Sequence, residues 1–231
     1  QLHINRIWAV VKLRNRVARD LHDDMGSTLS TINILSSMAK TKLHTDPVKT
    51  SEYISKISDN SQRMMEAMDD IVWSIKPQND SMEKVISRMR EFSTSALEAK
   101  EIEFRFDVDE EVYKLKLPMD DRRDLFLIFK EALNNIVKYA RCNQVNIALE
   151  KSGKILILRI EDNGEGIPES KIATVFDMFV RASESSEGSG LGLYIVKDVI
   201  LKLNGKVDLT STENVGTTFS LEIPNLYEDV R

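Results

Sequence analysis

The 231-residue sequence has one cysteine and no uninterrupted apolar run of the length that crosses a bilayer, about 18 residues. Cys142 is therefore unable to form an internal disulfide, and a lone cysteine fits a reducing cytoplasm. No secretory signal peptide is recognisable. Basic residues are not in excess either, since 32 Lys and Arg stand against 37 Asp and Glu. The resulting net charge of −5 gives no support for nucleic acid binding, which needs a basic face.

Proline and glycine are scarce at the start of the chain, where residues 2–43 contain no proline and one glycine. Their apolar residues recur at steps of three and four, which predicts one long helix. The segment His44–Pro47 breaks this pattern, and a second apolar seam runs from Ile54 to Ile75. Two long helices joined by a short loop form an antiparallel hairpin. One hairpin cannot cover its own apolar stripe, so we expect two copies to form a homodimeric four-helix bundle.

The polar, helix-breaking segment Pro77–Asp80 marks the expected domain boundary, which divides the chain into residues 1–77 and 78–231. Beyond it, helical and strand-like patterns alternate. This order predicts an α+β layer, in which helices cover one face of a mixed sheet. The expected helices are 81–100, 120–140 and 191–203, and the expected strands are 102–108, 145–149, 154–160, 206–211 and 217–223.

Three polar residues share one face of the helix expected over residues 120–140. Asn135 lies four residues beyond Glu131, and Lys138 lies seven beyond it. A carboxylate beside an amide oxygen suits Mg²⁺, which is held by few protein ligands together with substrate phosphates. Lys138 could reach a phosphate as a point charge. Taken alone, such a pattern is more often a solvated helix face.

Two glycine-containing segments follow. Asp162–Gly166 comes after an expected strand, where a carboxylate can accept a hydrogen bond from the amine of adenine and glycines let the backbone approach a ligand. Gly188–Leu193 opens an expected helix and could wrap phosphate oxygens with free backbone N–H groups. It lacks the Lys and Ser/Thr ending of a P-loop and the surroundings of a dinucleotide fingerprint. The alternatives are a tight turn for the first segment and a flexible loop for the second.

In this order, the segments resemble the ATP-binding domain of sensor histidine kinases, a superfamily shared with type II topoisomerases and mismatch-repair ATPases. The resemblance covers roughly residues 80–225 and implies an α/β-sandwich domain that binds ATP with Mg²⁺. The N box of the family is resembled by Glu131–Tyr139, and its G1 box by Asp162–Gly166. Its F box is resembled by Phe176 and Phe179, and its G2 box by Gly188–Leu193. The pair Gly216-Thr217 resembles the family's Gly-Thr pair beside adenine.

The resemblance assigns roles to individual residues. It implies Asn135 on Mg²⁺, Asp162 on the adenine amine, and Glu131 at the metal site, either as a base or as a ligand of metal-bound water. The remaining residues of the boxes are implied to contact the nucleotide: Lys138, Tyr139, Gly164, Gly166, Gly188, Gly190, Leu191, Gly192 and Thr217.

His22 lies beside Leu21, at the flank of the apolar seam of the first expected helix. A neutral imidazole nitrogen at a partly exposed position is a competent nucleophile near neutral pH. Asp23 follows directly and could orient the ring or take its proton. An isolated histidine on a helix is usually a surface residue, and we interpret His3 and His44 in that way.

The segment Arg16–Ser27 resembles the H box of histidine kinases that partner helix-turn-helix response regulators of the nitrate-response type. The resemblance covers residues 10–76. It implies that His22 is phosphorylated and that the phosphoryl group then moves to an aspartate of a receiver domain. Many members carry Gln five residues after the histidine, where it positions water for receiver dephosphorylation. This sequence has Ser27 there, so we expect kinase activity with weak phosphatase activity.

The sequence thus predicts the cytoplasmic catalytic core of a dimeric sensor histidine kinase. Since Gln1 lies inside a helical pattern and no Met precedes it, we expect a fragment of a longer chain, with any membrane attachment upstream. Two alternatives remain open. One is an ATPase of the same superfamily without phosphohistidine, and the other is a non-enzymatic scaffold that binds nucleotide to dock a partner.

Overall fold

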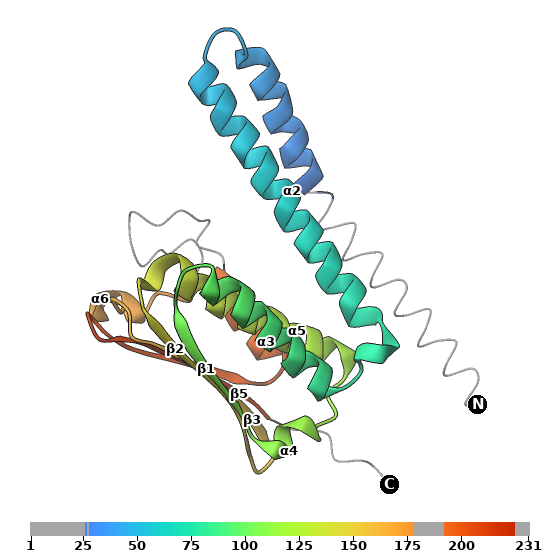
Figure 1. The fold of residues 1–231 in the computed structure, drawn as a ribbon, viewed down its shortest axis with the longest axis vertical. Helices are drawn as coiled ribbons and strands as arrows, with labels where there is room; N and C mark the ends of the chain where they lie inside the picture. The colour runs from blue at the N-terminus through green and yellow to red at the C-terminus, as the bar shows by residue number, and fades with distance from the viewer. Residues whose placement is uncertain (1–25, 27, 178–191, 225–231) are drawn as a thin grey trace, which may run out of the picture. The chain divides into compact units, whose positions relative to one another are not determined.

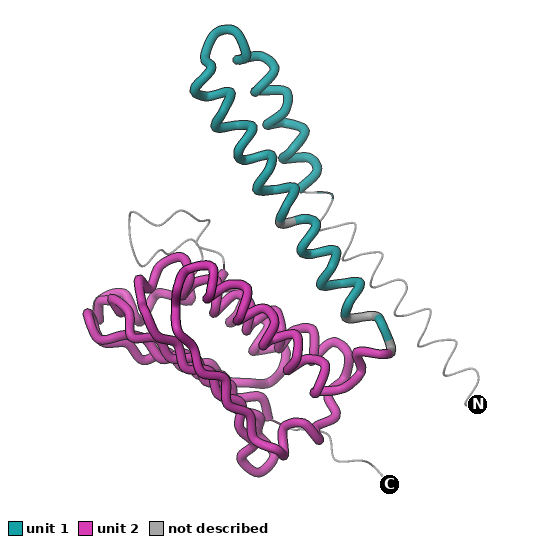
Figure 2. Tube along the Cα trace, viewed as in Figure 1, with its two compact units in different colours: residues 1–76 teal, residues 77–231 magenta. Residues whose placement is uncertain are grey.

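The computed structural model describes residue 26, residues 28–177 and residues 192–224 (Figure 1). The chain divides into two compact units, Gln1–Lys76 and Pro77–Arg231, which are coloured separately in Figure 2.

The first unit is a helical hairpin. Residues 28–42 are helical, a turn follows at 43–45, and α2 spans Pro47–Ile75. The start of α2 is well defined, because Pro47 occupies the first turn and the Asp46 side chain accepts a hydrogen bond from the Lys49 N–H at 3.0 Å. The long first helix expected over residues 2–43 is therefore described only in its second half.

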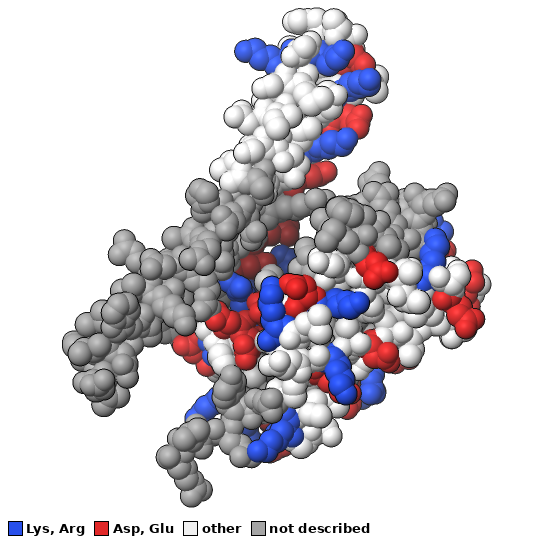
Figure 3. Space-filling model, turned by 180° about the vertical axis from the view of Figure 1, so that it is seen from behind, with Lys and Arg blue, Asp and Glu red and all other residues white. Residues whose placement is uncertain are grey.

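Many large apolar side chains of this hairpin are exposed, and Figure 3 shows a broad surface there that carries neither acidic nor basic groups. Exposed apolar side chains in this number, on a surface without charged groups, are typical of an interaction site. The expected homodimer would cover it, and dimerisation stays a prediction. The exposed residues are Leu29, Ile34, Met38, Leu43, Val48, Ile54, Met65, Met68 and Val72.

The second unit is built on a five-stranded mixed sheet with the order β1-β2-β3-β5-β4. Only β1 and β2 pair in parallel, and the other neighbours are antiparallel. The sheet confirms the expected mixed architecture. Its strands are β1 Glu103–Val108, β2 Gln144–Ser152, β3 Ile155–Asp162, β4 Lys206–Thr212 and β5 Gly216–Ile223.

Three helices cover one face of this sheet: α3 Met82–Glu98, α5 Met119–Asn135 and α7 Gly192–Lys202 (Figure 1). The strands alternate between buried apolar and exposed polar residues, which directs one side of the sheet towards the helices. The ring of Phe106 on β1 meets that of Phe129 on α5 edge-on, with 6.2 Å between centroids. The core includes Val85, Ile86, Met89, Leu125, Leu133, Val145, Ile147, Leu149, Leu156, Leu158, Ile160, Phe219 and Leu221.

Several short elements were not expected from the sequence. They are the 3₁₀ turn η1 Pro77–Asn79, the one-turn helices α4 Glu110–Tyr113 and α6 Glu169–Ile172, and the π-helical turn η2 Ile136–Ala140 that extends α5. Each is too short to show a hydrophobic period. The π turn ends at Arg141, which takes a left-handed conformation with φ 51° and stops the helix.

Candidate nucleotide-binding site

Glu131 and Asn135 lie one turn apart on α5, as their spacing predicted. The Asn135 Nδ2 group donates a hydrogen bond to Glu131 Oε1 at 3.3 Å, and both residues are half-buried. This bond fixes the orientation of the amide and leaves the Asn135 Oδ1 atom for another partner. An amide oxygen beside a carboxylate is a donor set that fits Mg²⁺, which prefers oxygen ligands. Among the residues described here, no group of three His, Cys, Asp or Glu side chains could form a cation site of its own.

The first residue of α7 lies against the Glu131 carboxylate. A methyl group added to Gly192 would collide with Glu131 Oε1, so a larger residue here would displace the carboxylate from this position. The N-terminal end of a helix carries a partial positive charge, which favours a carboxylate at this position. The structure therefore brings the segment that resembles the N box together with the last residues of the segment that resembles the G2 box, where α7 begins.

Asp162 is the last residue of β3 and lies opposite Thr217 of β5. The residue is 6% exposed, and its carboxylate accepts hydrogen bonds from the backbone N–H groups of Gly164, at 2.9 Å, and Thr217. Burial raises the pKa of this carboxyl, while the two backbone donors act in the opposite direction. The result is an acceptor held in one orientation by its own loop and by the neighbouring strand.

Three glycines allow the close backbone packing around Asp162. A side chain at Gly164 would collide with the Ala140 carbonyl at the end of the π turn. Gly166 has φ 67° and passes against the Thr212 carbonyl, and Gly216 has φ 140° and passes against the Asp162 carbonyl. At the last two positions, both the conformation and the space exclude a side chain.

Asn163 ties the same loop to the start of β2, a role that the sequence did not reveal. Its Oδ1 accepts the backbone N–H groups of Asn143, at 3.1 Å, and Gln144, at 3.0 Å, and its Nδ2 donates to Asn143 Oδ1 at 2.7 Å. The sequence offers a tight turn as the alternative for Asp162–Gly166, and a turn describes the backbone and gives no partner for the Asn163 side chain.

Ser211 on β4 is a second residue that was missed. Its hydroxyl accepts the Ile167 N–H at 2.8 Å and donates to the Gly216 carbonyl at 3.0 Å. The Thr217 hydroxyl lies 2.9 Å from the Ser211 hydroxyl oxygen and forms a hydrogen bond with it. Ser211 thus joins the end of the G1 segment to the Gly216-Thr217 pair, and a lone serine in a strand gives no sequence signal for this.

The remaining expected residues are placed as follows. Lys138 and Tyr139 lie in the π turn directly after Asn135, and both are exposed. Phe176 is half-buried. His22, Asp23, Ser27, Phe179, Gly188, Gly190 and Leu191 lie outside the described residues.

Comparison with known proteins identifies the class. Residues 120–226 match the family model described as Histidine kinase-, DNA gyrase B-, and HSP90-like ATPase, and residues 14–80 match a family model described as Histidine kinase. The two matches together span most of the chain. The chain therefore belongs to the histidine kinases and carries both of their domains.

Individual relatives agree with this assignment. The chain is 26% identical to the sensor histidine kinase DesK of Bacillus subtilis over 222 residues, which cover 95% of this chain and 54% of DesK. It is 23% identical to the sensor protein kinase WalK of Staphylococcus saprophyticus, covering 93% of this chain and 37% of WalK. The chain thus spans about half or less of these relatives.

Solved structures show the same architecture. The mycobacterial sensor histidine kinase MprB is similar with a TM-score of 0.50 and 29% identity, covering 62% of this chain and 94% of that one. Full-length ShkA is similar with a TM-score of 0.62 and 16% identity, covering 93% of this chain and 46% of that one, and shows the fold. In the part of the chain that the structure describes, no helix has the length and hydropathy of a membrane span.

Proposed function

We propose that the protein transfers the γ-phosphoryl group of ATP to His22, and that this group then passes to an aspartate of a response-regulator receiver domain. Two observations together support the proposal. Residues 14–80, which include His22, match a histidine kinase family model, and Glu131, Asn135 and Asp162 are held in place by hydrogen bonds in the domain that matches the ATPase family model. The proposed domains are residues 1–77 for dimerisation and phosphotransfer and residues 78–231 for ATP binding.

Each side chain has a proposed role. The buried Asp162 carboxylate accepts the adenine amine, and Asn135 Oδ1 with Glu131 would hold Mg²⁺, which when bound neutralises charge on the phosphates. Lys138 lies in the turn after Asn135 and approaches the phosphates as a positive charge. An imidazole nitrogen of His22 bonds to the γ-phosphorus as the bond to the ADP oxygen breaks, while Asp23 orients the ring and takes its proton.

The cellular setting is part of the proposal. The exposed apolar side chains of the hairpin support a homodimer, and the matched domains support a cytoplasmic kinase core. The mixture of acidic and basic side chains over the face shown in Figure 3 offers no support for a nucleic acid partner.

Labelling with γ-labelled ATP and Mg²⁺ tests this function. We expect the protein to gain acid-labile, base-stable phosphate, and His22→Gln to lose it while ADP binding persists. His44→Gln is the matched control, because His44 is an exposed histidine in the hairpin turn. Undiminished labelling of His22→Gln would contradict the assignment. ATP turnover without protein-bound phosphate would favour the ATPase alternative, and nucleotide binding without turnover would favour the scaffold.

A further inference from the structure

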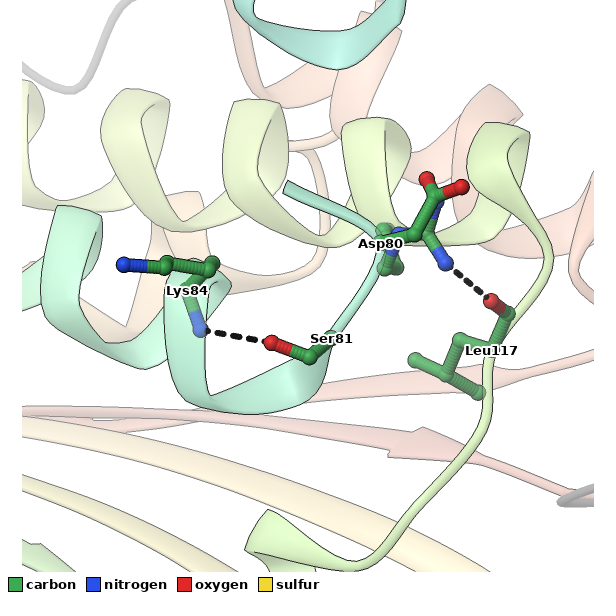
Figure 4. Close-up of polar contacts among 5 residues, drawn as sticks. Asp80, Ser81, Lys84 and Leu117 are labelled. Carbon is green, nitrogen blue, oxygen red and sulfur yellow. Dashed lines mark hydrogen bonds and ion pairs between the residues drawn. The ribbon is translucent and has the colours of Figure 1, made fainter. Parts of the chain in front are cut away.

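Arg122, near the start of α5, is a buried charged residue with 7% of its surface exposed. Its guanidinium donates to the Leu117 carbonyl at 2.8 Å through Nη1 and forms an ion pair with the Asp80 carboxylate through Nη2. Figure 4 shows Asp80 and the Leu117 carbonyl, whose hydrogen bond is drawn as a dashed line. A buried guanidinium needs such partners, since a buried charge without them is strongly unfavourable.

Asp80 occupies a defined place in the connection between the two units. Helix α2 ends at Ile75, Lys76 is extended with φ −74° and ψ 120°, and η1 covers Pro77–Asn79. Immediately after Asp80, the Ser81 hydroxyl accepts the Lys84 N–H at 3.4 Å and begins α3 (Figure 4). Asp80 therefore lies near the start of the second unit, between η1 and α3.

The partner of Asp80 lies on the helix that carries the proposed magnesium ligands. Glu131 and Asn135 follow Arg122 by nine and thirteen positions on the same helix. At 1.5 Å per residue, they lie about 14 and 20 Å along its axis. Because a helix is rigid over this length, the ion pair holds the end of the connection at a fixed distance from the ligands.

We propose that Asp80 and Arg122 are positioning residues for autophosphorylation, because their ion pair anchors the segment that follows α2 to helix α5. This inference rests on the proposed function. The chain passes between the units once, so the residues in this connection limit how often bound ATP reaches the acceptor histidine. Loss of the pair removes this anchor, and a less constrained connection lowers the effective concentration of one unit at the other. Errors of about 1 Å in the position of reacting groups can reduce a rate on the order of a hundredfold.

The test compares Asp80→Asn with Asp80→Glu and with Asp107→Asn in the full chain. Asp107 is a matched control, because it also forms an ion pair, with Arg105, and its side chain is 57% exposed compared with 55% for Asp80. The Asp107–Arg105 pair lies on the face of the sheet that the helices leave open. We expect Asp80→Asn to lower the maximal rate of His22 labelling about tenfold, with KM for ATP and ADP affinity changed less than about twofold. Asp80→Glu should recover part of the rate, and Asp107→Asn should match the wild type.

A distance measurement separates failure of this inference from failure of the proposed function. Spin labels at Ser58→Cys in the first unit and Ser95→Cys in the second, both exposed positions, are placed in a Cys142→Ala background and diluted with unlabelled chain. We expect Asp80→Asn to broaden the distance distribution and Asp107→Asn to leave it unchanged, whether or not the protein labels His22. An unchanged distribution overturns the inference. So does a labelling rate within twofold of wild type, or a loss confined to KM.

Discussion

Replacing Asp162 with Asn changes one atom and removes an acceptor at the point where the proposed site recognises adenine. The carboxylate already accepts the backbone N–H groups of Gly164 and Thr217, and the proposal adds the adenine amine as a third donor. Asparagine has one acceptor oxygen, and its NH₂ group must face at least one of these donors. Two consequences follow, one for stability and one for affinity.

The stability of the second unit should fall only slightly. A buried N–H group left without an acceptor costs about 1–3 kcal/mol. Burial disfavours the charged form of Asp162, as its raised pKa shows, so removing the charge offsets part of that cost. The midpoint of thermal unfolding should therefore decrease by no more than a few degrees, at roughly 2–4 °C per kcal/mol for a domain of this size.

Nucleotide affinity should fall much further. A hydrogen bond to a charged group contributes about 1.5–3 kcal/mol, which corresponds to a Kd about 10- to 150-fold weaker. Titration calorimetry should show this loss equally for ADP and for an ATP analogue, because both contain adenine. Asn135→Ala, by contrast, should weaken only the magnesium-dependent part of ATP binding. If a folded Asp162→Asn protein kept the wild-type affinity for ADP, the assignment of Asp162 to adenine would be wrong.

Three further predictions follow from the same residues. The pKa of Asp162 is raised from 3.8, so ADP affinity measured by calorimetry should decrease as pH falls through the raised pKa, because protonation removes the acceptor. The folded state also binds this proton more tightly than the unfolded chain, so the wild type should gain stability relative to Asp162→Asn as pH falls from the raised pKa to 3.8. Curves of affinity or unfolding midpoint against pH that run parallel for the wild type and Asp162→Asn would contradict this. Gly192→Ala should displace the Glu131 carboxylate and weaken magnesium-dependent ATP binding about tenfold or more, with magnesium-free ADP binding as the control. Equal losses of affinity in both measurements would show that the substitution does not act through the magnesium ligands. Ser27→Gln should speed dephosphorylation of the phosphorylated receiver and leave His22 labelling unchanged, whereas rapid dephosphorylation by the wild type that is lost in Ser27→Ala would show that serine suffices.

Features with a short sequence period were predicted well. The four-residue spacing of Glu131 and Asn135 on a helix placed both side chains together, and the structure joins them by a hydrogen bond. All five strands were expected close to their observed positions, because alternation of apolar and polar residues marks a sheet with one covered face. Asp162 was expected at a strand end and is the last residue of β3. The short elements η1, α4 and α6 were missed, since a single turn has no period to detect.

Contacts between residues distant in the sequence were decided by the tertiary structure. Gly192 had been interpreted as a phosphate-loop glycine, but its lack of a side chain also makes room for Glu131, which lies on another helix. Ser211 and Asn163 act through backbone groups of other strands and loops, and Arg122 finds Asp80 across the fold. A sequence shows which residue types can pair, and local periodicity orients them on an element. The partner is selected only when packing of the helices on the sheet brings two elements together and burial makes an unsatisfied polar group costly.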